Sequence, residues 1–255
     1  MRFLLSRRWV LFAVAVALMA LGAVRLGEWQ FDRLADREQR NEWTERNLAA
    51  EPAPVDAVLG VDQPVPADRE WTRVEVTGEY DADATVVVRY QTRDGEPGVD
   101  VVTPLVTRSG TAVLVDRGWV PTDNTGTVPA DLPQPPSGEV DVVGWVRGDA
   151  TGRGIEVESG STRAISSVEI GDRLDYPVYA GFVDAQSETP PPTDEVQRTE
   201  LPDLGEGPHF FYGLQWWFFG ALAVFGFGYL AWDERRQRRR TREGGHAREE
   251  PVRRA

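Results

Sequence analysis

Two long apolar runs lie toward the ends of the chain, and a stretch of alternating polar and apolar residues separates them. Residues 9–26 form an 18-residue run interrupted only by Arg25, and residues 210–232 form a 23-residue run with Gln215 as its only strongly polar side chain. An α-helix needs about 20 apolar residues to cross roughly 30 Å of hydrocarbon. The pattern therefore predicts two transmembrane helices, over residues 9–27 and 209–232.

Between these runs the hydrophobic period changes to two, which is typical of β-strands. Val74, Val76 and Tyr80 alternate with Arg73 and Glu75. Seven such segments, mostly rich in valine, predict strands over residues 71–80, 85–90, 99–107, 111–120, 139–147, 161–170 and 176–184. Ser109-Gly110 is a turn signal that predicts a hairpin. We expect an antiparallel all-β core over about residues 71–184, and the pattern leaves a barrel and a sandwich equally open.

The remaining segments complete the expected domain organisation. Residues 28–50 are charged and free of glycine and proline, so they predict a helical extension of the first span into water. Prolines at positions 52, 54, 64 and 66 end this helix and begin a domain that we place at residues 51–208. Residues 1–8 and 233–255 are the two basic termini.

Charge orients the two predicted spans. Residues 28–208 carry 36 acidic and 15 basic side chains, whereas the flanking segments are basic and bring the whole chain to a net charge of −13. Arginines next to a span tend to remain cytoplasmic. We therefore expect a multi-pass protein of a bacterial plasma membrane with both termini in the cytoplasm and the β domain outside it. An alternative is that the first run is a signal peptide cleaved near Ala20-Leu21-Gly22.

Composition excludes several classes of function. The chain has no cysteine, so it has neither disulfides nor thiolate chemistry. Its acidic body would repel a phosphate backbone, which argues against nucleic-acid binding. The only two histidines, His209 and His246, lie outside the predicted strands, and no motif of a serine hydrolase, phosphate loop or zinc protease is present. We predict that the protein is not an enzyme and has no protein-ligated metal site.

Four short motifs follow one another in a specific order along the chain. They read GEWQFDR at residues 27–33, TPL at 103–105, DRGWVP at 116–121 and HFFYGLQW at 209–216. In this order, between two spans, they resemble the Surfeit locus protein 1 family. The sequence departs from the usual family pattern at Asp116, where asparagine is common, at Arg37, where lysine is common, and at Pro208, where asparagine is common.

The resemblance implies an assembly factor for haem-copper terminal oxidases, specifically cytochrome c oxidase. It implies haem a as a transient cofactor, and cytochrome c oxidase subunit I and a haem a synthase as partners. In this picture the haem a site comprises His209, Tyr212, Gln215 and Trp216, and the residues with partner or structural roles are Trp29, Gln30, Arg33, Arg117 and Trp119.

The residues themselves give a weaker form of this hypothesis. A neutral imidazole is a good axial ligand for haem iron, and His209 stands where a polar loop meets an apolar, aromatic helix. On a helix, Tyr212 and Trp216 would share its face. The plainer interpretation is an interfacial histidine within an ordinary aromatic belt. Gln30 and Gln215 are candidates for joining the two helices, and Arg117 with Trp119 is interpreted as a capped turn at the end of a strand.

Two rival functions remain open from the sequence. One is a scaffold that stabilises oxidase subunits without binding haem, and the other is a membrane-tethered β domain that binds an unrelated envelope ligand.

Overall fold

A computed structural model describes residues 2–123, 131–205 and 207–246, with side chains from Leu4 to Arg240 in those ranges. The chain divides into two units. The first comprises Met1–Gln39 and Gly205–Ala255, and the second comprises Arg40–Leu204. The elements in chain order are η1 (Arg2–Leu5), α1 (Arg7–Ala49), β1 (Ala53–Pro54), α2 (Val55–Val58), β2 (Arg73–Tyr80), η2 (Ala82–Ala84), β3 (Val86–Arg93), β4 (Glu96–Thr107), β5 (Ala112–Pro121), β6 (Glu139–Arg147), β7 (Ser161–Thr162), α3 (Ser167–Gly171), β8 (Val178–Thr189) and α4 (His209–His246).

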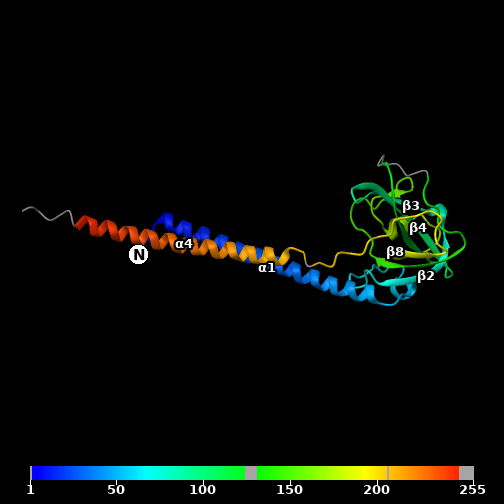
Figure 1. The fold of residues 1–255 in the computed structure, drawn as a ribbon, viewed down its shortest axis with the longest axis horizontal. Helices are drawn as coiled ribbons and strands as arrows, with labels where there is room; N and C mark the ends of the chain where they lie inside the picture. Colours follow the sequence, from blue (N-terminus) through cyan, green and yellow to red (C-terminus); the bar gives the residue numbers. More distant parts are fainter. Residues whose placement is uncertain (1, 124–130, 206, 247–255) are drawn as a thin grey trace, which may run out of the picture. The chain divides into compact units, whose positions relative to one another are not determined.

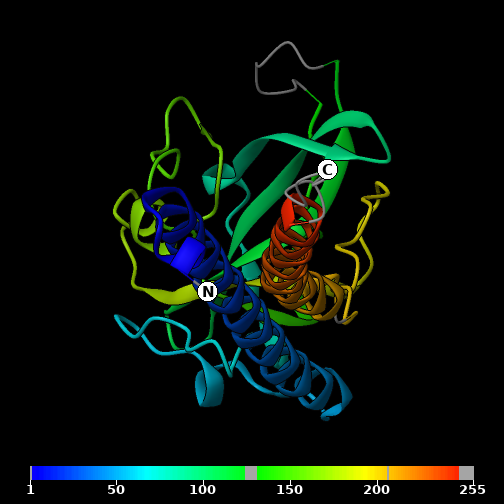
Figure 2. The same ribbon diagram turned by 90° about the vertical axis from the view of Figure 1, so that its left-hand side faces the viewer.

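The first unit is a pair of long helices that lie side by side (Figures 1 and 2). Helix α1 is continuous over the predicted span, residues 9–27, and nearly all of the predicted helical extension, residues 28–50. Helix α4 continues past the predicted end of its span into the basic tail, whose last residues, 247–255, lie outside the described part of the chain.

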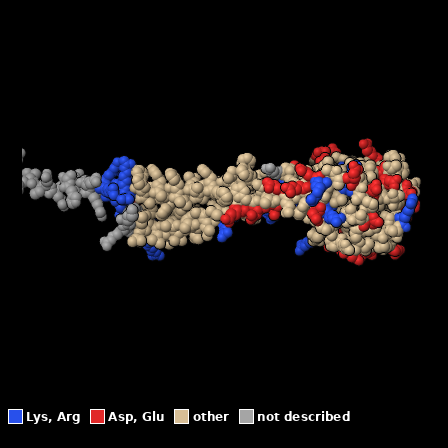
Figure 3. Space-filling view, turned by 90° about the horizontal axis from the view of Figure 1, so that it is seen from below, with Lys and Arg blue, Asp and Glu red and all other residues tan. Residues whose placement is uncertain are grey.

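Both helices are long and apolar enough to cross a membrane. Only 17% of the most apolar window of α1 and 11% of that of α4 is buried in the protein, which distinguishes both from the core helices of a soluble domain. Figure 3 shows an uncharged surface along the helix pair that ends at a blue cluster of basic residues. The arginines of α4 at this end stand at positions 235, 236, 238, 239 and 240.

The second unit contains an eight-stranded sheet in the order β1-β2-β6-β8-β5-β4-β3-β7, with an additional pairing of β2 with β4. The pairings β2–β6–β8–β5–β4–β2 form a closed cycle of five strands, which is the connectivity of a small barrel. The long strand β4 makes this possible, because its first half pairs with β3 while its last residues pair with β2.

The prediction of a purely antiparallel sheet was wrong, since the sheet is mixed. Strand β8 runs parallel to β5, and the two-residue strands β1 and β7 run parallel to β2 and β3. A closed cycle of five strands cannot alternate in direction throughout, so at least one neighbouring pair must be parallel. The pair β5–β8 meets this requirement.

Most of the predicted strands are present in the structure, but the prediction of one strand was wrong. Strands β4 and β5 form the antiparallel hairpin expected around Ser109-Gly110. Residues 161–170 instead form the short strand β7 and the helix α3. The Oγ of Ser166 accepts a hydrogen bond from the backbone N–H of Glu169, and this N-cap begins a helix where a strand was expected.

The core of the second unit consists mainly of valines from the inward positions of the strands. Its larger cluster includes Val74, Leu105, Val115, Val142 and Val183, all with no exposed surface. These strands hold several charged residues at inward positions as well.

Candidate functional site

The two long helices pack through small residues. A Cβ atom on Gly27 of α1 would lie 2.3 Å from the Trp217 ring, and one on Gly220 of α4 would lie 3.1 Å from the Cβ of Ala23. A Cβ on Gly213 would lie 2.8 Å from the Phe31 ring. Glycine and alanine therefore permit a close approach of the backbones, as is common between helices in membranes.

Aromatic rings fill the space beside these glycines. Phe31 lies with its ring centroid 4.9 Å from that of Trp217 and 6.2 Å from that of Phe210. Near the other end of the pair, Trp9 and Phe12 pack against Phe227 at 5.7 and 5.3 Å. The order of these contacts shows that α1 and α4 run antiparallel.

His209 is held by a residue of the other helix. Its Nδ1 lies 2.9 Å from Oε1 of Gln30, and both side chains are half-buried. An amide oxygen can only accept a hydrogen bond, so a hydrogen bond between these two atoms requires a hydrogen on Nδ1 of His209. In a neutral imidazole the other nitrogen, Nε2, then carries the lone pair. A side chain in this state can ligate iron through Nε2.

The other three predicted haem residues differ in how far they are exposed to solvent. Trp216, two helical turns after His209, is half-buried with its ring 6.2 Å from that of Phe219. Tyr212 is 47% exposed, and Gln215 is exposed as well. The structure thus brings Gln30 to His209 and leaves Gln215 on the outer surface of α4.

Two further motif residues lie on the outer surface of α1. Trp29 is exposed, and the guanidinium of Arg33 lies 5.7 Å from the centre of its ring. Arg37, one turn further, donates from Nε to the carbonyl oxygen of Gly205 and so joins α1 to the segment that precedes α4.

Arg117 has a role in the β domain that the sequence did not reveal. The prediction of a capped turn at a strand end was wrong, because β5 continues to Pro121 and the Arg117 side chain has no exposed surface. Its Nε lies 3.1 Å from Oε1 of the equally buried Glu188. Its terminal nitrogens donate to the carbonyl oxygens of Pro133 and Gln134.

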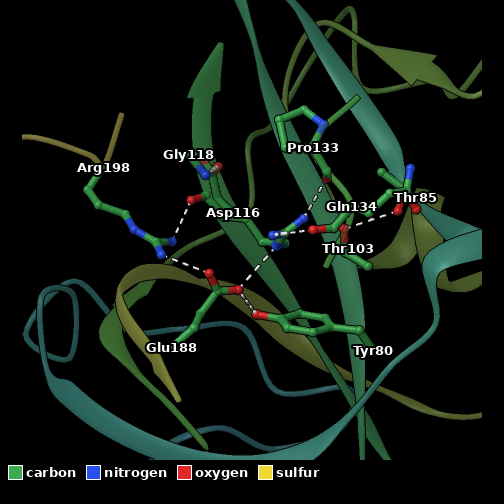
Figure 4. Close-up of polar contacts among 10 residues, drawn as sticks. Tyr80, Thr85, Thr103, Asp116, Gly118, Pro133, Gln134, Glu188 and Arg198 are labelled. Atoms are coloured by element: carbon green, nitrogen blue, oxygen red, sulfur yellow. Dashed lines mark hydrogen bonds and ion pairs between the residues drawn. The ribbon is translucent and has the colours of Figure 1, made fainter. Parts of the chain in front are cut away.

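Glu188 is the centre of this cluster (Figure 4). It accepts hydrogen bonds from the Tyr80 hydroxyl at 2.6 Å and from Nη2 of Arg198 at 2.7 Å. Burial alone would raise the pKa of Glu188, but these hydrogen bonds and the two arginine charges lower it below its usual value. Burial, together with the negative charge of Glu188, raises the pKa of Tyr80. The cluster is therefore a structural ion-pair network in which Glu188 is ionised.

Trp119, the other residue of this motif, packs over a glycine. A Cβ on Gly98 would lie 2.1 Å from the Trp119 ring, and the indole N–H donates to the carbonyl oxygen of Gln91 at 3.1 Å. Trp119 therefore joins β5 to β4 and β3.

Three buried carboxyl groups form a second charged cluster on neighbouring strands. Asp116 is paired with Asp184 in the register of β5 and β8, and Asp100 lies on β4. Arg93 contacts Asp100 at 3.1 Å, and Arg147 contacts Asp184 at 2.9 Å. Among the charged groups that the structure describes around Asp116, no arginine is paired with it, and its Oδ1 accepts from the Gly118 N–H at 3.0 Å.

Burial is the main cause of the raised pKa values of these three carboxyl groups. It raises the pKa of Asp100 to about 6, with Arg93 opposing and Asp184 adding to the rise. Burial and the charges of Asp100 and Asp184 raise the pKa of Asp116 well above its usual value, and burial raises that of Asp184 against the effect of Arg147. Among the described residues, no group of three or more histidines, cysteines and carboxylates is arranged to hold a metal ion.

These features define a protein with two long apolar helices, a mixed β domain that lies between them in the sequence, and a histidine of one helix hydrogen-bonded to the other. The chain belongs to the SURF1 family, the family that its four motifs resemble, because the sequence model of that family matches residues 17–221. Uncharacterized SURF1-like proteins of Mycobacterium bovis and of two strains of Mycobacterium tuberculosis are each 30% identical to it over 261 residues, covering 98% of this chain and 93% of the relative.

Proposed function

We propose that this protein is a membrane-bound assembly factor of cytochrome c oxidase that holds haem a and passes it to subunit I. The observation that carries the proposal is the position of His209. It lies at the first turn of an apolar helix, and its Nδ1 is engaged by Gln30 of the neighbouring helix at 2.9 Å. Both residues belong to motifs of the SURF1 family.

The residues around His209 fit a haem group. Iron in haem is held by one or two axial ligands, of which histidine is the commonest. The half-buried His209 would supply one through Nε2. The rings of Phe31 and Phe210, which adjoin Gln30 and His209 in the sequence, and that of Trp216, two helical turns further along α4, offer apolar surface for a porphyrin. Haem a is cargo here, so its redox chemistry serves the oxidase that receives it.

The proposed role is non-catalytic. His209 would supply one ligand to the iron, and a single protein ligand suits a group that must later be released. What this chain contributes is orientation of that imidazole and an apolar surrounding at the water boundary, so that the haem propionates can remain solvated.

The helix pair also offers a surface for the oxidase. Phe211, Phe218, Phe225 and Trp232 recur every seven residues along α4 and are between 56% and 74% exposed. Residues at this spacing form one stripe on a helix, as in helix–helix interfaces. We propose that this stripe contacts transmembrane helices of subunit I or of a haem a synthase.

We further propose that the protein lies in the plasma membrane of a bacterium, with the acidic residues 28–208 outside and the arginine-rich ends of α1 and α4 in the cytoplasm. Retention of the first span, and not its cleavage near Gly22, is supported by its contacts with α4. Val16 is buried, and Trp9 and Phe12 pack against Phe227.

The two histidines of the chain allow a matched test. The full-length protein is co-produced with haem a, purified through a tag without histidine, and its visible spectrum and haem content are measured. We expect His209→Ala to lose most of the haem, whereas His246→Ala keeps it. Unchanged haem in His209→Ala would refute the ligand assignment.

The same preparations separate the rival functions. Co-purification of subunit I without pigment would favour a scaffold that does not bind haem. A deletion strain with normal oxidase activity and normal haem a content would instead favour a tethered β domain with an unrelated envelope ligand.

A further inference from the structure

We infer that Gln30 is a positioning residue, which fixes His209 in the tautomer with hydrogen on Nδ1 and so keeps the lone pair of Nε2 available for iron. The use of Nε2 as an iron ligand rests on the proposed function. The hydrogen bond between Gln30 and His209 and the tautomer that it selects concern this chain alone. It assigns a task to the motif GEWQFDR, residues 27–33, whose glutamine lies 179 positions from the histidine it contacts.

The choice of tautomer follows from the partner atom. The Oε1 of Gln30 accepts hydrogen bonds and cannot donate one. An imidazole with hydrogen on Nε2 would place its Nδ1 lone pair against this oxygen, and two acceptors 2.9 Å apart repel one another. Metal-ligating histidines commonly donate their second ring N–H to a carbonyl or carboxylate in this way, which sets the ring orientation and raises the basicity of the ligating nitrogen.

The packing of the helices holds Gln30 at this point. One turn earlier, Gly27 lets Trp217 of α4 approach the backbone of α1, and the adjacent Phe31 packs on the same Trp217 ring at 4.9 Å. These contacts fix the register of the two helices beside the Gln30–His209 pair. Both side chains are half-buried, which reduces competition from water for the hydrogen bond.

Several charged residues of α1 near Gln30 have contacts elsewhere than at the His209 ring nitrogen. Glu28 pairs with Arg25 at 3.2 Å, Arg33 lies over Trp29, and Arg37 donates to the carbonyl oxygen of Gly205. The hydrogen-bond partner of Nδ1 of His209 is the neutral amide of Gln30. A neutral acceptor sets the tautomer without adding a charge beside the ligand.

The opposite orientation of the amide makes a different prediction. If the Gln30 side chain were turned by 180° about its last bond, its NH₂ would donate to Nδ1, and the hydrogen of the ring would move to Nε2. That form could not ligate iron through Nε2. The tautomer of His209 is therefore the observable that decides the inference.

The test uses the full chain in lipid nanodiscs, with His246→Ala present so that His209 is the only histidine, and with a tag that contains none. Ring ¹⁵N NMR shifts at a pH where the imidazole is neutral distinguish the two tautomers. We expect hydrogen on Nδ1. Gln30→Met, which is similar in size but has no acceptor, is expected to give a mixture, whereas Gln30→Glu keeps the Nδ1–H form. Gln39→Met, at an exposed position of the same helix, is the control.

Hydrogen on Nε2 in the parent protein, or a tautomer unaffected by Gln30→Met, would overturn the inference. A second measurement titrates the same proteins with ferric haem a and follows the Soret band. We expect Gln30→Met to weaken haem binding by about 10–100-fold, the usual effect of removing a partner of a ligating histidine, with Gln30→Glu restoring most of the affinity.

The two proposals fail separately in these measurements. Loss of haem in His209→Ala but equal affinity in Gln30→Met would overturn the role of Gln30 and leave the proposed function in place. Unchanged affinity in His209→Ala would overturn the ligand assignment, and the NMR result, which needs no haem, would still decide whether Gln30 sets the tautomer.

Discussion

Oε1 of Glu188 lies 3.1 Å from Nε of Arg117, and neither side chain has any surface exposed to solvent. The two residues are 71 positions apart and lie on the neighbouring strands β8 and β5. Burying two charges is costly, so a pair of this kind is stable only when the remaining donors and acceptors are also satisfied. Here Tyr80, Arg198 and two backbone carbonyl groups complete the network.

Glu188→Gln is expected to destabilise the β domain strongly. The substitution keeps the size of the side chain but removes the charge that balances Arg117, and breaking a buried pair in this way costs about 3–5 kcal/mol. Urea unfolding of the full chain in detergent, followed by tryptophan fluorescence, should show a lower midpoint. The matched control is Glu139→Gln, which removes the partner of Arg108 in an exposed pair and should leave the midpoint unchanged.

Asp116→Asn is expected to stabilise the protein at neutral pH by on the order of 1 kcal/mol. The amide keeps an acceptor oxygen for the Gly118 N–H and removes a carboxyl group whose pKa is raised by burial. The urea midpoint at pH 7.5 measures the effect. A lower midpoint in the variant would contradict this explanation.

The pH dependence of stability follows from the same carboxyl groups. Asp100 has a folded-state pKa of about 6, above its value in an unfolded chain, so the folded state binds protons more tightly in this range. Between about pH 4 and pH 6 this group therefore makes the protein less stable as pH rises. Asp100→Asn should flatten this part of the profile of urea midpoint against pH. An unchanged slope in the variant would show that Asp100 titrates normally.

Local patterns predicted the elements well because periodicity depends on nearby residues. The two apolar runs form parts of α1 and α4, and alternating valines mark most strands. The N-cap by Ser166 could also have been found, since Ser166 and Glu169 have the spacing of a capping box. The parallel pairing of β5 with β8 could not, because it follows from closing a cycle of five strands and not from either strand alone.

The contacts of the candidate site were harder to predict for a similar reason. The sequence left both Gln30 and Gln215, each at or within a predicted span, as candidates for joining the two helices. Only the rotation of each helix about its axis decides that Gln30 contacts His209 and that Gln215 is exposed. Likewise, a charged residue within a valine-rich strand gives no sign of its partner, as Arg117 and Glu188 illustrate.

The orientation across the membrane can be tested because the chain contains no cysteine. Single cysteines are introduced at Gln186, an exposed residue of β8, and at Arg239, within the basic segment of α4. In intact cells a membrane-impermeant maleimide should label Gln186→Cys and not Arg239→Cys, since arginine-rich flanks remain cytoplasmic. Both should be labelled after lysis. Labelling of Arg239→Cys alone in intact cells would reverse the proposed topology.

The close packing of the helices predicts different effects for two glycines on α1. A Cβ on Gly27 would lie 2.3 Å from the Trp217 ring, whereas a Cβ on Gly22 would have no neighbour within 4 Å. Because side chains at the contact set the distance between packed helices, Gly27→Val should push α1 and α4 apart and displace Gln30 from His209. Spin labels on cysteines at Leu26 and Leu214 should then report a longer and broader distance, with reduced haem content in the same preparation. Gly22→Val adds the same side chain to the same helix and should change neither. Equal effects of the two substitutions would mean that any residue larger than glycine disturbs the span, and would refute a specific contact at Gly27.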